Sequence, residues 1–280
     1  MEHADEQKRK SFVTDKFIYI TLARVVGRKK HDEEIEDKWG FYQLAKPFFK
    51  REAIRVQSTA DWDVFKSMAL RVKHLILKPN TMALGTGIYA ADTYTEKDAR
   101  KEFDHITAKG GTWIVEERIV QDDRMAQWNE SSVNTIRYYS VLSHGSFHSL
   151  TPVLRIGRRG SVVDNAGQGG IIANINANTG VVESNGFDES CSYYKTHPDS
   201  KLVFMNAQIP EWESLVKTVE TIHRTVMPHH PYIGWDFALS KDKGWCVIEA
   251  NWGQFLNQYV DKIGRKDEFL RYINAKPDQD

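Results

Sequence analysis

The stretch Tyr232–Asn251 reads YIGWDFALSKDKGWCVIEAN, and its pattern predicts the centre of the fold. Two short apolar runs, Ile233–Leu239 and Trp245–Ala250, lie on either side of a polar segment that runs from Ser240 to Gly244. Apolar runs of this length around a short polar, glycine-containing segment are typical of a β-hairpin. The sequence therefore predicts two paired antiparallel strands that lie in the core.

Three polar side chains interrupt this apolar hairpin, namely Asp236, Glu249 and Asn251. Glu249 and Asn251 are two residues apart on one strand, so both point to the same sheet face, and antiparallel pairing brings Asp236 opposite them. Converging carboxylate and amide oxygens suit a hard divalent cation, above all Mg²⁺. The alternative is a buried cluster of hydrogen-bonded polar groups that holds no metal, because such groups are costly without partners.

Composition indicates an ordinary globular protein. The 280 residues are 41% apolar and 27% charged, and Lys and Arg balance Asp and Glu at 38 each, so no overall field favours nucleic acid. Cys191 and Cys246 are far apart and form no CxxC motif, which favours a reducing compartment. The charged start of the chain has no apolar segment behind it, and no apolar run reaches the length of a membrane span. We expect a cytoplasmic protein without a membrane span.

Two lysines and a glycine-containing loop have the features of a phosphate site. Lys38 stands near the start of a predicted helix, and Lys78 ends a short apolar strand. The loop that follows, Asn80–Ile88, reads NTMALGTGI, and Gly85 and Gly87 allow backbone N–H groups to turn toward an anion. A lysine ammonium is a point charge for phosphate oxygens. A plain hairpin turn is the alternative, and the loop does not match the GxxxxGK[ST] motif.

Charged residues also interrupt three other predicted strands. The strand Thr112–Ile119 ends in Glu116 and Glu117, and adjacent carboxylates at a strand end are usually solvated. Arg137 and Arg155 each lie inside an apolar strand, where an arginine must be paired or face a cleft. Either arginine can neutralise phosphoryl charge or bind a carboxylate. A structural ion pair with a carboxylate is the alternative for each.

The segment Val163–Ile171 reads VDNAGQGGI, a polar glycine-rich loop between two predicted strands. Its glycines let the backbone approach a ligand, so Asn165, Gly169 and Gly170 are candidates for triphosphate or substrate contacts. An ordinary flexible turn is the alternative.

Two histidine-containing features are predicted to have no catalytic or metal role. Cys191 and His197 lie in the segment 184–200, which we interpret as an insertion loop rather than the source of a nucleophile pair. His229 and His230 are interpreted as a turn pair rather than a metal site.

The order of these features resembles the ATP-grasp superfamily over about Asp37–Gln258. Asp37-Lys38 is similar to its DK element, and Lys78 is similar to its second phosphate lysine. The run Glu116-Glu117-Arg118-Ile119 resembles its interlobe hinge, where main-chain groups hold adenine. The resemblance implies that Asp236, Glu249 and Asn251 bind magnesium, and that Asp122 or Asp123 meets the ribose hydroxyls.

A narrower resemblance is to the sugar-transfer-associated ATP-grasp proteins, which are found with surface-polysaccharide biosynthesis. Besides the hairpin, the segments that carry this similarity are Ser132–Leu142, Val153–Gly157 and Val163–Ile171. The implied fold is α+β, with two lobes that grip ATP between antiparallel sheets. Residues 1–36 would form a helical segment and linker, 37–119 the small lobe and 120–280 the catalytic lobe.

The implied activity is an ATP- and Mg²⁺-dependent carboxylate–amine ligase that forms an acyl phosphate. Its substrates would be a small-molecule or saccharide carboxylate and an amine, with Arg137 covering the γ-phosphate and Arg155 a second candidate. A kinase for a hydroxyl acceptor and a non-catalytic ATP-binding partner of a glycosyltransferase remain as alternatives.

The chain departs from the superfamily pattern at two places. Only 36 residues precede Asp37, where the superfamily usually carries a Rossmann-like domain, so a short helical cap or a second copy of the chain would complete the acceptor pocket. Gly234 stands where many of these ligases have an arginine, so Arg137 or Arg155 must take that role.

Overall fold

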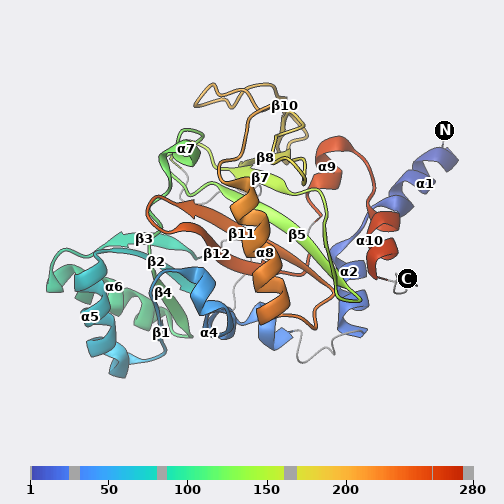
Figure 1. Cartoon of the computed structure of the whole chain (residues 1–280). Coiled ribbons are helices and arrows are strands. Elements are labelled where there is room, and N and C mark those ends of the chain that lie inside the picture. The colour runs from blue at the N-terminus through green and yellow to red at the C-terminus, as the bar shows by residue number, and fades with distance from the viewer. Residues whose placement is uncertain (1, 25–31, 81–86, 161–168, 254, 274–280) are drawn as a thin grey trace.

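The computed structural model describes residues 2–24, 32–80, 87–160, 169–253 and 255–273 (Figure 1). The predicted α+β class is confirmed, because two antiparallel sheets are combined with helices on their faces. The helical elements are α1 Glu2–Ser11, α2 Asp15–Leu22, η2 Asp32–Glu36, α4 Lys38–Phe49, η3 Thr59–Asp61, α5 Trp62–Val72, α6 Glu96–Lys109, α7 Asp123–Ala126, α8 Trp212–Val226, α9 Asn257–Asp261 and α10 Lys266–Ile273. The strands are β1 Ala53–Val56, β2 His74–Pro79, β3 Tyr89–Asp92, β4 Trp113–Glu117, β5 Thr135–Ser143, β6 Ser146–Ser149, β7 Val153–Ile156, β8 Ile171–Asn174, β9 Gly186–Phe187, β10 Tyr193–Tyr194, β11 Tyr232–Ser240 and β12 Gly244–Asn251.

The smaller sheet has the strand order β1-β4-β2-β3, and α5 and α6 cover one of its faces (Figure 1). Leu75 and Leu77 of β2 point into this apolar layer, whereas Lys78 lies on the same face as Ile114 and Glu116 of β4. The alternation of β2 thus sends its lysine away from the helices. At the start of α6, Thr95 and Asp98 form a capping box.

The larger sheet runs β10-β9-β8-β7-β5-β11-β12, with β6 paired to β5. Helix α8 packs on one face of this sheet and lies in front of it in Figure 1. Ile136 and Tyr138 of β5 point to this face. Tyr139 and Val141 point to the other face and pack with residues of α2, α9 and α10. Both sides of strand β5 are therefore buried.

The predicted hairpin lies at one edge of this sheet rather than at its centre, because β12 is the outermost strand and pairs with β11 alone. Strand β11 is buried along its whole length between β5 and β12, and a β-bulge interrupts its pairing with β12 after Asp236. Gly244 closes the turn at a φ of 66°, a left-handed conformation that glycine adopts without strain.

Two regions differ from the sequence interpretation. The helical segment expected within residues 1–36 contains two helices, α1 and α2, and α2 begins where Thr14 accepts a hydrogen bond from the Phe17 N–H. The segment 184–200 was predicted as a loop, yet it contributes β9 and β10 to the edge of the larger sheet. Helices α2 and α4 both pack into the cores of the larger lobe.

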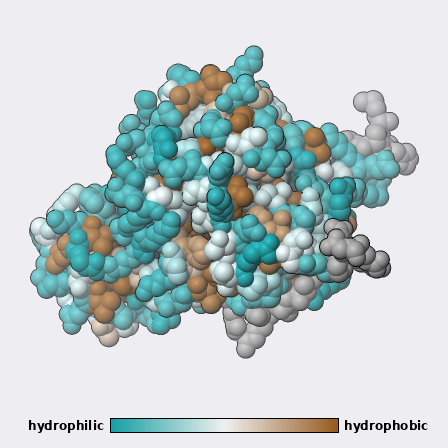
Figure 2. Space-filling view, viewed as in Figure 1, coloured by the Kyte–Doolittle hydropathy of each residue, from teal (hydrophilic) through white to brown (hydrophobic). Residues whose placement is uncertain are grey.

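The viewed surface is mostly hydrophilic, and its hydrophobic areas are separated from one another (Figure 2). Within the described residues, no helix combines the length and the apolar character that crossing a membrane requires.

Candidate active site

A row of ionisable side chains crosses four neighbouring strands of the larger sheet. Arg155 of β7 lies opposite Thr135, two residues before Arg137 on β5. Arg137 lies opposite Asp236 of β11, which in turn lies opposite Glu249 of β12. Opposed residues share a sheet face, so all four side chains project from the same side.

Asp236 is the hub of this row and is only 3% exposed. Arg137 donates from both Nε and Nη2 to its carboxylate, and Arg155 donates from Nη1 to Oδ2 over 2.8 Å. Burial alone would raise the pKa of Asp236, but the two guanidinium groups outweigh it and hold the pKa well below its ordinary value. Asp236 is thus ionised. Arg137 and Arg155 both pair with it, which is the structural ion pair given as the alternative for each arginine.

Glu249 and Asn251 extend the row on β12. The Asn251 amide donates to Glu249 Oε1 over 3.3 Å, and the Glu249 and Asp236 carboxyl groups are hydrogen bonded to each other. Burial first, and then the negative charge of Asp236, raise the pKa of Glu249. The structure therefore brings the three predicted metal ligands together as two crowded carboxyl groups and an amide.

Gly234 makes room for Arg137. A Cβ atom at Gly234 would lie 3.4 Å from Arg137 Cδ and equally close to the Asn251 carbonyl oxygen and the Tyr139 ring. The Arg137 side chain therefore passes over the position where a side chain of residue 234 would begin. This arrangement is compatible with the expectation that Arg137 takes the role of the arginine that many of these ligases have in place of Gly234.

Lys78 reaches the same region from the smaller sheet. It forms a buried ion pair with Glu116, which also accepts hydrogen bonds from Arg51 Nε and Nη2 at 3.1 and 2.8 Å. Arg51 Nη1 continues to the Val247 carbonyl oxygen at 2.6 Å and so joins the two lobes. Burial alone would raise the pKa of Glu116, but Lys78 and Arg51 lower it to about 2. Glu116 is thus a buried anion rather than a solvated strand end.

Lys38 is placed by the first turn of α4. Asp37 caps the helix by accepting from the Trp39 N–H, and the Asn80 side chain donates to Asp37 over 2.8 Å and accepts from Trp39 over 2.9 Å. The Lys38 ammonium donates to the Asn80 carbonyl oxygen over 3.4 Å.

Burial lowers the pKa of Lys38, while Glu249 attracts it and Lys78 repels it. Both lysines therefore lie within electrostatic reach of each other and of the carboxylates on the larger sheet.

The hinge residues connect the two lobes. The Glu117 N–H donates to the Glu52 carbonyl oxygen, and its carboxylate accepts from Lys243 over 2.7 Å. Ile119 follows the end of β4 and is partly exposed. Asp123 is exposed and pairs with Lys241 over 2.8 Å, so the candidate ribose residue lies beside the β11–β12 turn.

The glycine-rich loops are only partly described. Gly85 and Asn165 lie outside the described residues, so their predicted contacts cannot be compared with the structure. Gly87 and Gly169 have φ values of 78° and 84°, which glycine adopts readily, and Gly170 is buried just before β8.

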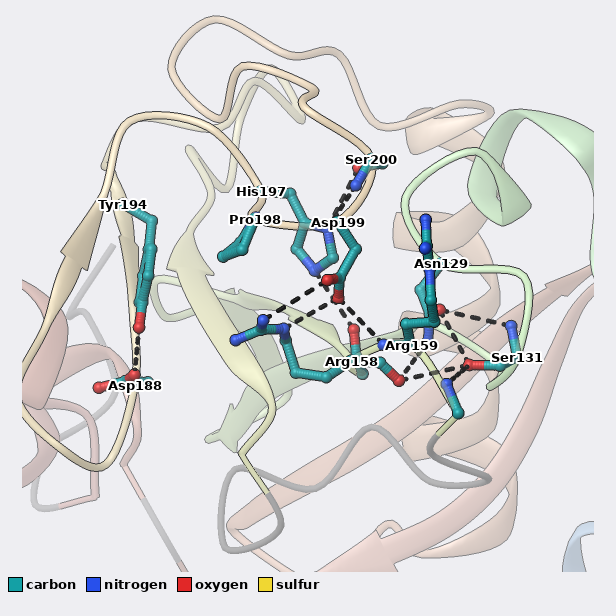
Figure 3. A network of polar contacts seen from close by, with 12 residues as sticks. Asn129, Ser131, Arg158, Arg159, Asp188, Tyr194, His197, Pro198, Asp199 and Ser200 are labelled. Carbon is teal, nitrogen blue, oxygen red and sulfur yellow. Dashed lines mark hydrogen bonds and ion pairs between the residues drawn. The ribbon is translucent and has the colours of Figure 1, made fainter.

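A second polar network lies beside β7 and binds the segment that was expected to be a loop (Figure 3). Arg158 donates from Nε to Asp199 over 2.9 Å, and the Arg159 N–H donates to the same carboxylate. His197 is fully buried and contacts the Gly157 carbonyl oxygen, whereas Cys191 is exposed. This network is an anchor between loops, and it holds the turn after β7 in place.

Sequence reasoning missed Arg51 and a cluster of Glu34 with His229 and His230. Arg51 follows a helix end in a run of charged residues, where nothing in the local pattern indicates burial. The histidine pair was interpreted as a turn, but both rings contact Glu34. Neither contact has a local signal, because both join residues far apart in the chain.

The chain resembles several solved structures at low sequence identity. N5-carboxyaminoimidazole synthetase from Staphylococcus aureus gives a TM-score of 0.55 at 9% identity, covering 95% of this chain and 59% of that protein. D-alanyl-alanine synthetase A from Vibrio cholerae gives 0.52 at 10%, covering 86% and 65%. The ATP-grasp ligase PsnB, solved with a precursor variant, Mg and ADP, gives 0.52 at 11%, covering 89% and 61%. The chain thus spans less than two thirds of these proteins, and at such identity the likeness shows the fold.

The family model described as sugar-transfer associated ATP-grasp matches residues 19–262, while no curated protein matches the chain. The matched range contains both sheets and the whole row of ionisable groups. The chain therefore belongs to the sugar-transfer associated ATP-grasp family.

Proposed function

We propose that this protein is an ATP- and Mg²⁺-dependent carboxylate–amine ligase. One observation carries the proposal: the row Arg155–Arg137–Asp236–Glu249 on the larger sheet lies within electrostatic reach of the two lysines of the opposite lobe. Oxygen donors on one side and cations on both sides form the arrangement that a metal–triphosphate complex needs. The ligases of similar fold support the reaction class.

The residues present fit a magnesium ion. Asp236, Glu249 and Asn251 offer hard oxygen ligands, and the crowding that raises the pKa of Glu249 would be relieved by a divalent cation between the carboxylates. When bound, Mg²⁺ would neutralise charge on the β- and γ-phosphates. The PsnB complex with Mg and ADP supports this assignment.

Each cation of the site has a role in binding the nucleotide. Lys38 and Lys78 would hold the α- and β-phosphates, with Gly85, Gly87, Asn165, Gly169 and Gly170 as candidate backbone contacts. Adenine would lie at the hinge of Glu116, Glu117 and Ile119, and its ribose at Asp123. Arg137 would exchange one of its contacts with Asp236 for the γ-phosphate, and Arg155 would bind the substrate carboxylate or acyl phosphate.

The chemistry needs positioning and charge neutralisation rather than a protein nucleophile. A carboxylate oxygen of the substrate attacks the γ-phosphorus, the bond to the β–γ bridging oxygen breaks, and ADP leaves. An amine then attacks the acyl carbon of the acyl phosphate, loses a proton, and releases inorganic phosphate as the amide forms. Arg137 and Arg155 would stabilise the charge that develops in both steps.

The family description supports a role near sugar transfer. We propose a sugar-acid or amino-acid carboxylate as the acceptor, in cytoplasmic steps of surface-polysaccharide biosynthesis. Helix α2 packs on the larger lobe, so either the N-terminal segment or a second copy of the chain would border the acceptor pocket.

The direct test is a product assay with ATP, Mg²⁺, a panel of sugar acids and amino acids, and an amine. The proposal predicts ADP and phosphate only when both a carboxylate and an amine are present, together with an amide product. AMP as the product would refute it. A phosphorylated hydroxyl compound formed without amine would identify a kinase instead, and ATP binding without turnover on any substrate would favour a binding partner.

A further inference from the structure

A histidine-rich cluster lies where η2 meets the loop that follows α8. Glu34 of η2 contacts His229 and His230, which are almost two hundred positions later in the chain. The ligand atoms of these three residues lie within 4.8 Å of one another. We propose that Glu34, His229 and His230 form a second metal site that binds one zinc ion, separate from the magnesium ligands on β11 and β12.

The geometry favours a shared cation. Both histidines direct their Nε2 atoms at the same oxygen, Glu34 Oε2, at 2.5 and 2.8 Å. Ligand atoms bonded tetrahedrally to zinc lie about 3.3 Å apart, given bond lengths of about 2.0 Å. Each histidine nitrogen therefore needs to move away from the Glu34 oxygen by less than about 1 Å to admit the ion.

The three side chains of the cluster differ in their exposure to solvent, and this difference suits the entry of a metal ion. His230 is fully buried, whereas the side chain of His229 is 31% exposed and that of Glu34 is 18% exposed. The buried imidazole would form a fixed ligand, and the other two can adjust around the ion. The exposed side leaves the fourth tetrahedral position to water.

The donor set selects the kind of metal. Two imidazole nitrogens and one carboxylate oxygen suit zinc, whereas magnesium prefers oxygen ligands alone. This donor set distinguishes the cluster from Asp236, Glu249 and Asn251, which offer carboxylate and amide oxygens but no imidazole nitrogen.

The position in the fold suggests a structural role. His223 of α8 contacts the His230 carbonyl oxygen through Nε2 and the Ser140 hydroxyl through Nδ1. The histidine loop is thereby tied to β5, while η2 leads directly into Asp37 and Lys38 at the start of α4. An ion at this point would clamp the segment before the nucleotide lysine onto the larger lobe.

The test measures zinc itself. We expect the full-length wild-type protein, freed of metal and dialysed against Zn²⁺ without nucleotide, to retain one ion per chain. We expect Zn²⁺ to raise its melting temperature in addition to any effect that Mg²⁺ has at the oxygen ligands of β11 and β12. Co²⁺ in place of Zn²⁺ should give the visible absorption of a tetrahedral site.

The variants Glu34→Gln and His229→Gln should each lower zinc affinity at least tenfold and remove the melting shift. Because the His229 side chain is partly exposed, its substitution tests the site even if Glu34→Gln does not fold. His105→Gln changes an exposed histidine outside the cluster and should bind zinc as the wild type does.

A further variant, Asp236→Asn, separates this proposal from the ligase assignment. Zinc binding that survives in Asp236→Asn and is lost in His229→Gln supports the cluster. Zinc binding that is equal in His229→Gln and the wild type, or that is lost in Asp236→Asn alone, overturns it. Neither readout depends on enzymatic turnover.

Discussion

At the scale of single residues, the site is built from charges that are buried and compensate one another. Asp236 is ionised because Arg137 and Arg155 hold it, whereas the neighbouring Glu249 has a raised pKa through burial and the charge of Asp236. The pKa values of two carboxyl groups in contact thus shift in opposite directions, because only Asp236 has both guanidinium partners. The crowded carboxyl groups of such a site destabilise the ligand-free protein, and a bound metal ion and nucleotide would offset this loss.

The variant Glu249→Gln tests this trade-off. Glutamine can keep a hydrogen bond to Asp236 but carries no charge, so at a pH above the raised pKa of Glu249 the metal-free variant should melt a few degrees higher than the wild type. The sign follows from the raised folded pKa: the folded wild type binds the proton more tightly than the unfolded chain, so its stability falls as pH rises through that pKa.

Below about pH 4 the glutamate is protonated in both states, and the two proteins should melt together. The ligase rate of the variant should fall by about 100-fold. Melting curves from pH 4 to 9 and the product assay check both parts. A variant that is less stable than the wild type at every pH would contradict this account of Glu249.

At the scale of elements, strand alternation determines which of two adjacent carboxylates is structural. Glu116 and Glu117 are neighbours on β4 and point to opposite faces. Glu116 is buried between Lys78 and Arg51, whereas the Glu117–Lys243 pair has side-chain exposures of 31% and 38%. The two glutamates should therefore contribute differently to the free energy of unfolding.

The matched variants Glu116→Gln and Glu117→Gln test this difference. Glu116→Gln leaves two buried cations without an anion and should lower the free energy of unfolding by about 3–5 kcal/mol. Glu117→Gln should cost about 1 kcal/mol or less, because a partly solvated ion pair contributes little. Urea unfolding measures both, and equal losses would show that burial does not govern these pairs.

At the scale of the whole molecule, the two lobes meet through charged contacts beside the proposed nucleotide site. Arg51 reaches the Val247 carbonyl oxygen, Lys50 reaches that of Lys243, and Lys243 pairs with Glu117. A ligand that binds between the lobes adds its own contacts to both, and so stabilises the folded chain by mass action.

Titration with ADP and Mg²⁺ tests this coupling. At 100 times the dissociation constant, ligand binding should add about 2.7 kcal/mol to the free energy of unfolding. With EDTA in place of Mg²⁺ most of this gain should disappear, because the phosphates would meet Asp236 and Glu249 without a cation between them. Thermal unfolding at fixed nucleotide concentration measures the difference, and an equal gain with EDTA would argue against metal-dependent binding.

The sequence by itself determined the α+β class, the β11–β12 hairpin, the face on which Asp236, Glu249 and Asn251 lie, and the family. These features follow from local periodicity and from motif order, both of which can be read along the chain. The position of Arg137 inside an apolar strand predicted that it is paired or faces a cleft.

Only the tertiary structure decided which partners these charges have. Arg51 joins Glu116, both arginines of the larger sheet share Asp236, and Glu34 meets His229 and His230. Each of these contacts spans more than sixty residues, and side-chain pairing at that separation depends on how the lobes and loops pack. Local sequence carries no signal for such packing, because the energy that selects it comes from burial in the completed fold.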